Sequence, residues 1–325
     1  VPALGQTGYE KIMPINPGSA DHVVVVLAGY NHDLEPAPLK IYVGVKGMAA
    51  DGTEIAADAD ERDQFLARNG LLYGKIYGLA LANEAYADLG IEADPNSKMM
   101  DAWLTSADAP ESFEAVFAPT SFQWGGWDSP VAVGQTEMTL WQAADEQPEG
   151  YTFFNGDSKT EHPAVDPDIT KQRYVQNMTQ EGGLIALDLE GMGAMLSELG
   201  AALPDMVPVT VDRMIAAVDG ALTLDVADKG IKHGGADTQA TWEDGQAKMV
   251  APDGLQWIKS SDADVLIVDE DSGNELGERR YALVIDPATM DLTEDGKGYF
   301  LAMAGGGLNP RALSEISAYG GTFSK

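Results

Sequence analysis

An all-β fold is predicted by three features of this 325-residue sequence. Short runs rich in Val, Ile, Tyr and Leu recur along the chain, and most are bounded by Gly, Pro, Asn or Asp, which is typical of β-strands. Segments with apolar residues at three- and four-residue steps, the pattern of an amphipathic helix, are few. Short strands at regular spacing favour a sandwich, a barrel or a propeller.

The expected elements can be given by residue range. Strands are expected at 22–30, 39–47, 74–81, 113–119, 138–143, 173–178, 183–190, 220–226, 255–260, 263–271, 279–286 and 298–304. Short helices are expected at 61–70, where Asn69-Gly70 would close the helix, and at 192–203 and 210–221. No linker rich in Pro, Gly or Ser divides the chain, so residues 1–325 are expected to form a single domain with helical insertions.

Composition excludes several classes of function. Asp and Glu number 52 against 20 Lys and Arg, which gives a formal net charge of −32. This field repels phosphate backbones and anionic membranes, so nucleic acid is excluded as a partner, whereas divalent cations are favoured. Adaptation to salty water explains the charge equally well. The absence of cysteine excludes disulfides, thiolate nucleophiles and cysteine-ligated metals. No apolar run is long enough for a membrane span.

The run VLIVDEDSGNELGERRYALVID, residues 265–286, reads as two strands joined by an acidic loop. Side chains alternate along a strand, so Asp269 and Asp271 should share one face while Glu270 points to the other. Clustered carboxylates suit Ca²⁺, and a plain solvated hairpin is the alternative. Arg279 and Arg280 could hold a phosphate by bidentate hydrogen bonds or could neutralise the acidic loop, and the second interpretation is favoured.

The four histidines do not show the spacing of a zinc motif. His32 beside Asp33, and His162 beside Glu161, are candidate ligands. Each of them alone is more typical of a histidine that is exposed or hydrogen-bonded in a loop. No nucleophile elbow, P-loop or dinucleotide fingerprint is present.

Several motifs occur in an order that resembles the PhoX-type alkaline phosphatases and their relatives. They are LGQTGYEKIMPIN, VVVVLAGYNHDLEPAPLKIYVGVKG, FLARNGLLYGKIYGL, TEHPAVDP, APDGLQWIKSSDADVLIVDEDSGNELGERRYALVID and LSEISAYGGTFS. The resemblance extends from about residue 4 to the end of the chain. It implies a single β-propeller of about six blades whose central channel holds calcium and, in the phosphatases, a di-iron centre. Secretion is usual in that family, so a secreted, periplasmic or cell-surface location is expected.

The resemblance also implies a set of metal ligands. They would be Glu10, Glu161, Asp253, Asp269, Asp271 and Glu315. The chain departs from the family pattern at three places. The arginine expected before Glu161 is absent, and Gly254 stands where the family has asparagine. The cysteine segment that holds iron is also missing, which puts Fe³⁺ in doubt. That segment is expected either before Val1 or to be absent from the protein, and a last strand is expected after the C-terminal end of this chain.

Two functions are therefore expected as alternatives. The first is a metal-dependent phosphomonoesterase, a hydrolase that acts on small phosphoesters held by metal ions. The second is a non-catalytic surface or assembly protein in which the same carboxylates bind Ca²⁺ to stiffen the fold or to support self-assembly. The missing cysteine makes the second alternative a serious rival to the first.

Overall fold

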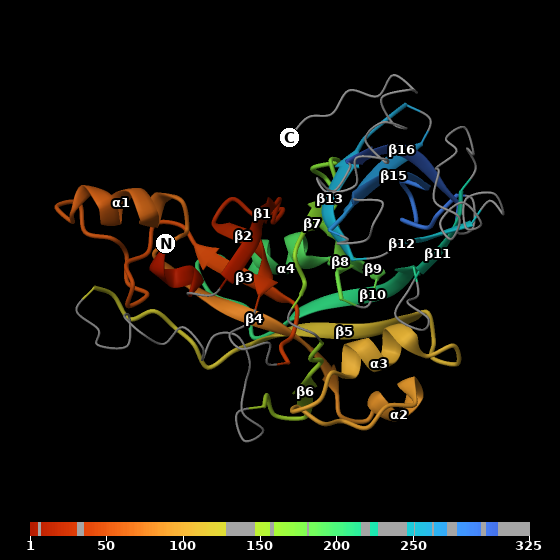
Figure 1. Cartoon of the computed structure of the whole chain (residues 1–325). Coiled ribbons are helices and arrows are strands. Elements are labelled where there is room, and N and C mark those ends of the chain that lie inside the picture. Colours follow the sequence, from red (N-terminus) through yellow and green to blue (C-terminus); the bar gives the residue numbers. More distant parts are fainter. Residues whose placement is uncertain are drawn as a thin grey trace.

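The computed structural model describes residues 1–5, 8–30, 36–127, 147–156, 159–180, 182–215, 222–226, 246–249, 251–261, 263–271, 278–293 and 297–304. These residues form a mostly β structure with few helices (Figure 1). The helices are η1 (Pro2–Leu4), α1 (Glu61–Arg68), α2 (Tyr86–Leu89), α3 (Met99–Thr105) and α4 (Met192–Leu199).

Two sheets contain the strands. The first comprises β1 (Gly8–Ile15), β2 (His22–Tyr30), β3 (Lys40–Val45), β4 (Tyr73–Ala82), β5 (Ser112–Pro119), β6 (Tyr151–Phe153), β7 (Pro163–Val165), β8 (Arg173–Met178), β9 (Gly183–Asp188) and β10 (Val207–Ile215). The second comprises β11 (Leu222–Val226), β12 (Gln246–Met249), β13 (Pro252–Ile258), β14 (Asp264–Glu270), β15 (Glu278–Ile285) and β16 (Lys297–Ala304).

The first system is a nearly closed, barrel-like sheet. Nine antiparallel strands follow the order β1-β2-β3-β4-β5-β10-β9-β8-β7, and β6 pairs with β4 beside this path. The two end strands, β1 and β7, contact each other, which brings the sheet close to closure. The all-β expectation is therefore confirmed, whereas the propeller is not.

The interior of the barrel-like sheet explains the run of valines in β2. Val24 and Val26 point into the main core, while Val25 and Leu27 point outward and pack under η1 and α1. Both sets are buried because the strand is covered on both faces, so the run is continuously apolar rather than alternating. Trp103 of α3 packs edge-on against Phe113 at 5.0 Å between ring centroids and so closes the core near β5.

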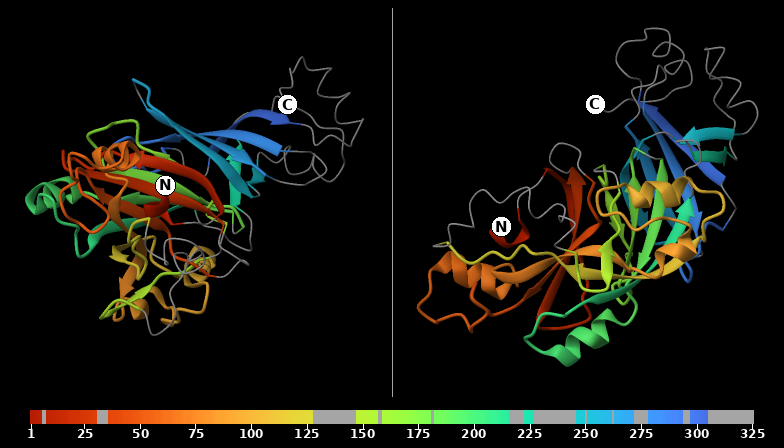
Figure 2. Two further views of the ribbon diagram at one scale, coloured as in Figure 1. Left: turned by 90° about the vertical axis from the view of Figure 1, so that its left-hand side faces the viewer. Right: turned by 90° about the horizontal axis from the view of Figure 1, so that it is seen from below.

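The second system is a six-stranded sheet in the order β12-β11-β16-β15-β14-β13, which we call sheet 2. Its pairs are antiparallel except for β11 with β16, which are parallel. Sheet 2 lies to one side of the barrel-like sheet, in teal to blue (Figures 1 and 2). Leu255, Leu266 and Leu283 pack there against Val175 and Ala186 of β8 and β9.

The helical expectation at 210–221 is wrong for residues 210–215. Val207, Val209 and Val211 alternate with less buried residues, and β10 pairs with both β5 and β9 along this stretch. The alternation of buried and less buried residues is that of a strand, although the three- and four-residue spacing of apolar residues in 210–221 favours a helix. The other two expected helices are present as α1 and α4. The expected strand at 138–143 lies outside the described residues.

No helix within the described ranges is both long enough and apolar enough to cross a membrane.

Candidate functional site

The ends of the barrel-like sheet meet sheet 2 along one line of contact. Here β1 contacts β7, and β13 contacts both β7 and β8. We call this place, formed by β1, β7, β8 and β13, the seam (Figure 1). Lys11 of β1 extends across the seam, where its Nζ donates to the carbonyl of Leu255 at 2.8 Å. The seam gathers short segments that are distant in the sequence.

Two of the six predicted carboxylates meet at the seam. Glu161 stands just before β7, and Asp253 is the second residue of β13. The register between β13 and β14 shifts between Pro252 and Leu255, so Asp253 lies in a bulge. A bulge redirects the side chain of the extra residue, and here that side chain lies against the segment before β7.

His162 is bonded to Asp253 in two ways. Its Nδ1 lies 2.8 Å from Asp253 Oδ1 and 2.8 Å from the Asp253 carbonyl oxygen. A hydrogen on Nδ1 satisfies both acceptors, and Nε2 has no hydrogen-bond partner in the described part of the chain. The side chains of His162 and Asp253 are 26% and 30% exposed, so solvent can reach the pair. A carboxylate that holds one ring nitrogen in this way fixes the tautomer and orientation of an acid–base histidine.

Side chains from β8 hold this pair in place. Asn177 accepts from the His162 backbone N–H at 2.7 Å through Oδ1. Its Nδ2 donates to the carbonyls of Pro252, at 2.7 Å, and Asp253. The Thr179 hydroxyl, just beyond β8, lies 2.7 Å from the Pro252 carbonyl and 3.0 Å from Glu161 Oε2. These contacts fasten the start of β13 to the barrel-like sheet.

Glu161 is the most buried carboxyl group of the seam, with 2% of its surface exposed. It accepts from Thr179, and its side chain is also hydrogen-bonded to that of Asp253. Glu161, His162 and Asp253 thus form one connected group, which we call the seam triad.

Electrostatics favour the charged forms of the histidine and the aspartate. The hydrogen bond with Asp253 raises the pKa of His162, against burial and the charge of Lys11, which lower it. The pKa of Asp253 is lowered, first by its bond with His162, then by its bond with Glu161 and by the charge of Lys159. Burial lowers the pKa of Lys11. In a chain with 32 excess negative charges, two lysines lie close enough to act on this one site.

The remaining predicted ligands do not join the seam triad. Asp269 of β14 lies next to Gly254, where an added Cβ would lie 2.9 Å from the Asp269 Cβ. Its carboxylate is engaged by Arg280, which donates from Nε at 2.5 Å and from Nη2 at 2.9 Å. This pairing supports the interpretation that Arg280 neutralises the acidic loop. Glu270 is buried on the opposite face of β14, as the alternation predicts.

Other predicted residues are exposed or lie beyond what the structure describes. Asp271 is exposed after β14, and Glu10 is exposed at a register shift of β1. Glu315 lies outside the described residues, as do His32, Asp33 and the hairpin loop at 272–277. The side chain of Arg279 is likewise not among those described.

Calcium or iron would need several ligand atoms that converge on one point. Within the described ranges, no group of three or more His, Asp or Glu side chains has an arrangement that could hold a metal ion. In the seam triad Asp253 is bonded to His162 Nδ1, which leaves Nε2 as the ring nitrogen open to another partner, and no further described His, Asp or Glu side chains complete a metal-binding group around it. The triad therefore does not fit calcium or iron, and the chemistry considered below is that of its own side chains.

Sequence reasoning missed two residues of this site, Asn177 and Thr179. It gives His162 only as a candidate ligand beside Glu161, because its partner Asp253 is 91 positions away. Asn177 and Thr179 belong to the strand pattern RYVQNMT and carry no signal of their own. Comparison of the chain with protein families, curated proteins and solved structures finds no match.

Proposed function

We propose that this protein hydrolyses small phosphomonoesters and that His162 is its acid–base residue. The observation that carries the proposal is the bond of His162 Nδ1 to Asp253 at 2.8 Å in a partly exposed position, with Nε2 left for a substrate. The raised pKa of His162 favours the imidazolium, which has a proton to donate from Nε2.

The surroundings of the pair support an anionic substrate. Lys11 and Lys159 act electrostatically on His162 and Asp253, and an imidazolium adds a third positive charge. A phosphate monoester needs cationic groups at its oxygens and an acid at its leaving group. In the proposed reaction, water attacks phosphorus and the bond to the ester oxygen breaks. His162 Nε2 gives its proton to the departing alkoxide, and the attacking water loses a proton to solvent.

A second function is favoured by a different observation. His162, Asn177 and Thr179 all bond the backbone of Pro252 and Asp253, so the same cluster fastens sheet 2 to the barrel-like sheet. This is what a non-catalytic surface or assembly protein would need at the seam. The six-bladed propeller, the bound calcium and the export of the chain stay predictions from the family resemblance under either function.

One substitution separates the two functions. His162→Asn places an amide near the position of Nδ1, so a bond to Asp253 is retained while the imidazole is lost. If His162 is the acid–base residue, hydrolysis of p-nitrophenyl phosphate should fall by about 10²- to 10⁴-fold in kcat. The unfolding midpoint should change little in the same variant.

His22→Asn is the matched control, because His22 is fully buried and bonds Ser19 and Ala202 away from the seam. This variant should lose stability and keep its kcat. Assays run with and without added Ca²⁺ and Fe³⁺ ensure that a metal requirement does not hide the activity. Phosphate release that is absent from the wild type, or that is equal in the wild type and His162→Asn, rejects the enzyme and favours the assembly protein.

A further inference from the structure

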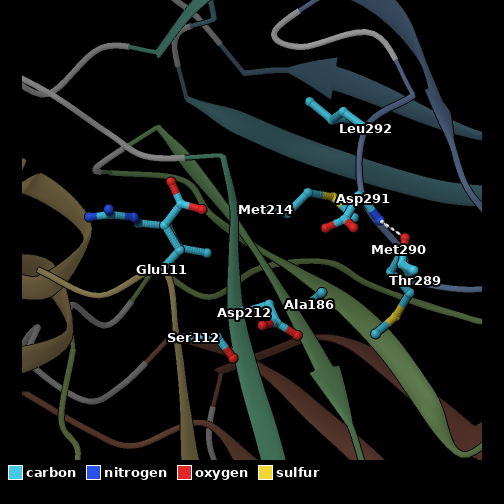
Figure 3. A pocket seen from close by; sticks show the side chains of 10 residues that line it. Glu111, Ser112, Ala186, Asp212, Met214, Thr289, Met290, Asp291 and Leu292 are labelled. Carbon is cyan, nitrogen blue, oxygen red and sulfur yellow. Dashed lines mark hydrogen bonds between the residues drawn. The ribbon is translucent and has the colours of Figure 1, made fainter.

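A cavity of 610 Å³ opens on the outside of the barrel-like sheet, remote in sequence from the seam triad. Its walls come from β5, β9 and β10 and from the connection that follows β15, and Figure 3 shows these side chains around it. The volume lies in the range of small-molecule sites, and such sites often occur where two structural layers meet.

Three carboxylates face this cavity from separate parts of the chain. They belong to Glu111, Asp212 and Asp291. None of the three forms an ion pair or a side-chain hydrogen bond with another described residue. The cavity therefore holds three carboxylates that no described ion pair engages, against the single positive charge of Arg213.

The basic residue of the cavity donates its hydrogen bonds to backbone carbonyls and not to these acids. Arg213 alone is basic among the described residues that line it. Its Nη1 donates to the carbonyls of Trp103 at 3.0 Å and Ser106 at 2.6 Å, and its Nη2 donates to that of Ala109 at 3.2 Å. The guanidinium is thus hydrogen-bonded to the backbone at and after the end of α3, and its Cζ lies 5.8 Å from the Trp103 ring centroid.

Apolar side chains lie between the carboxylates. Met214 and Leu292 line the cavity together with Met290, which is itself buried. Methionine adapts to flexible apolar chains, and separated carboxylates suit separated ammonium groups. This mixture of methylene-binding and ammonium-binding groups distinguishes the cavity from the acidic surface found elsewhere on the chain.

We propose that this cavity binds a linear polyamine, with ammonium groups at Glu111, Asp212 and Asp291 and with methylene groups against Met214, Met290 and Leu292. A bare divalent cation is a poorer occupant, because the described acids do not converge into a metal-binding group. The proposal is independent of the hydrolase proposed above.

The test is a calorimetric titration of the full chain with spermidine. At about 10 mM ionic strength, where the Debye length is about 30 Å, binding should saturate at one molecule per chain. Asp212→Asn should weaken it about three- to fivefold, and Asp212→Asn with Asp291→Asn should weaken it further. Asp58→Asn is the control, because Asp58 is exposed and remote from the cavity while the change in net charge is the same.

A neutral probe of similar length, 1,8-octanediol, should bind much more weakly than spermidine. Thermal unfolding without ligand verifies that each variant is folded, and Asp291→Asn, at an exposed position, replaces any variant that is not. Equal weakening by Asp58→Asn and Asp212→Asn would show that only the overall charge attracts the ligand. That outcome, the absence of saturation, or equal affinity for the diol would each overturn the proposal.

Discussion

Arg173 joins the barrel-like sheet to sheet 2, and its replacement by methionine should lower the free energy of unfolding by about 3 to 5 kcal/mol. Arg173 Nε and Nη2 both lie 2.7 Å from Asp166 Oδ2, and the two side chains are only 3% and 1% exposed. Arg173 also donates to the carbonyls of Pro287 and Ala288, and its guanidinium lies 5.7 Å from the Trp257 ring centroid.

The magnitude follows from what the substitution leaves behind. Methionine keeps most of the aliphatic packing but removes the charge, so Asp166 stays buried without its cation. Removing one partner of a buried pair usually costs about 3 to 5 kcal/mol, whereas an exposed pair contributes below about 1 kcal/mol. Arg62→Met is the exposed control, because Arg62 and Asp63 are 53% and 23% exposed.

Urea unfolding followed by circular dichroism measures both variants, with the free energy obtained from the midpoint and the slope. The double variant Asp166→Leu/Arg173→Met should recover part of the loss, because it leaves no buried charge. A loss below about 1 kcal/mol for Arg173→Met, equal to that of Arg62→Met, would refute the reasoning that Asp166 depends on Arg173 as its buried cation.

Three further predictions follow from single features of the structure. Asp253 raises the pKa of His162 above its unfolded value. The pair should therefore stabilise the fold fully below about pH 6.5 and lose this effect as the pH rises through the raised pKa. An NMR titration of the imidazole in the wild type and in Asp253→Asn measures this difference in the pKa of His162. An added Cβ at Gly29 would lie 2.3 Å from the Gly8 carbonyl oxygen, so Gly29→Ala should cost more stability in thermal unfolding than Gly47→Ala, where the added Cβ meets nothing within 4 Å. If the 265–280 hairpin binds Ca²⁺, Arg280→Gln should release Asp269 from its ion pair and raise the affinity for Ca²⁺ up to about fivefold, as measured by calorimetry. An unchanged affinity for Ca²⁺ would show that Asp269 is not a ligand.

Local patterns predicted the local elements well. α1 follows from its caps, because Asp60 accepts from the Arg62 backbone N–H and Gly70, with φ of +66°, directly follows the Asn69 cap. β1 was missed because Glu10, Lys11 and Pro14 interrupt its apolar pattern. This is tolerated because β1 lies at the end of the sheet, and proline fits a strand with one unpaired edge. The three-residue strands β6 and β7 are too short to show a period.

The candidate site depended on contacts that have no local signal. Glu161 and Asp253 were named together only through the family resemblance, and the structure brings this pair into contact. The resemblance did not indicate that His162 would bond Asp253 and Asn177. The spacing of apolar residues indicates which face of a helix or strand is buried. The contact between β7 and β13 depends instead on how the two sheets pack against each other.

The position of β10 has a consequence for how the chain folds during synthesis. β1 to β5 each pair with a neighbour made immediately before or after, so this half can assemble as the chain emerges. β5 then has an unpaired edge until Val207–Ile215 has been made, because β10 lies between β5 and β9 although it is made after β9. Joining the early and late strands of the barrel-like sheet therefore requires a long loop to close, so we expect this step of folding to be slow. An exposed β5 edge makes the unfinished chain prone to pairing with other chains, and a holding chaperone would be most useful at this stage.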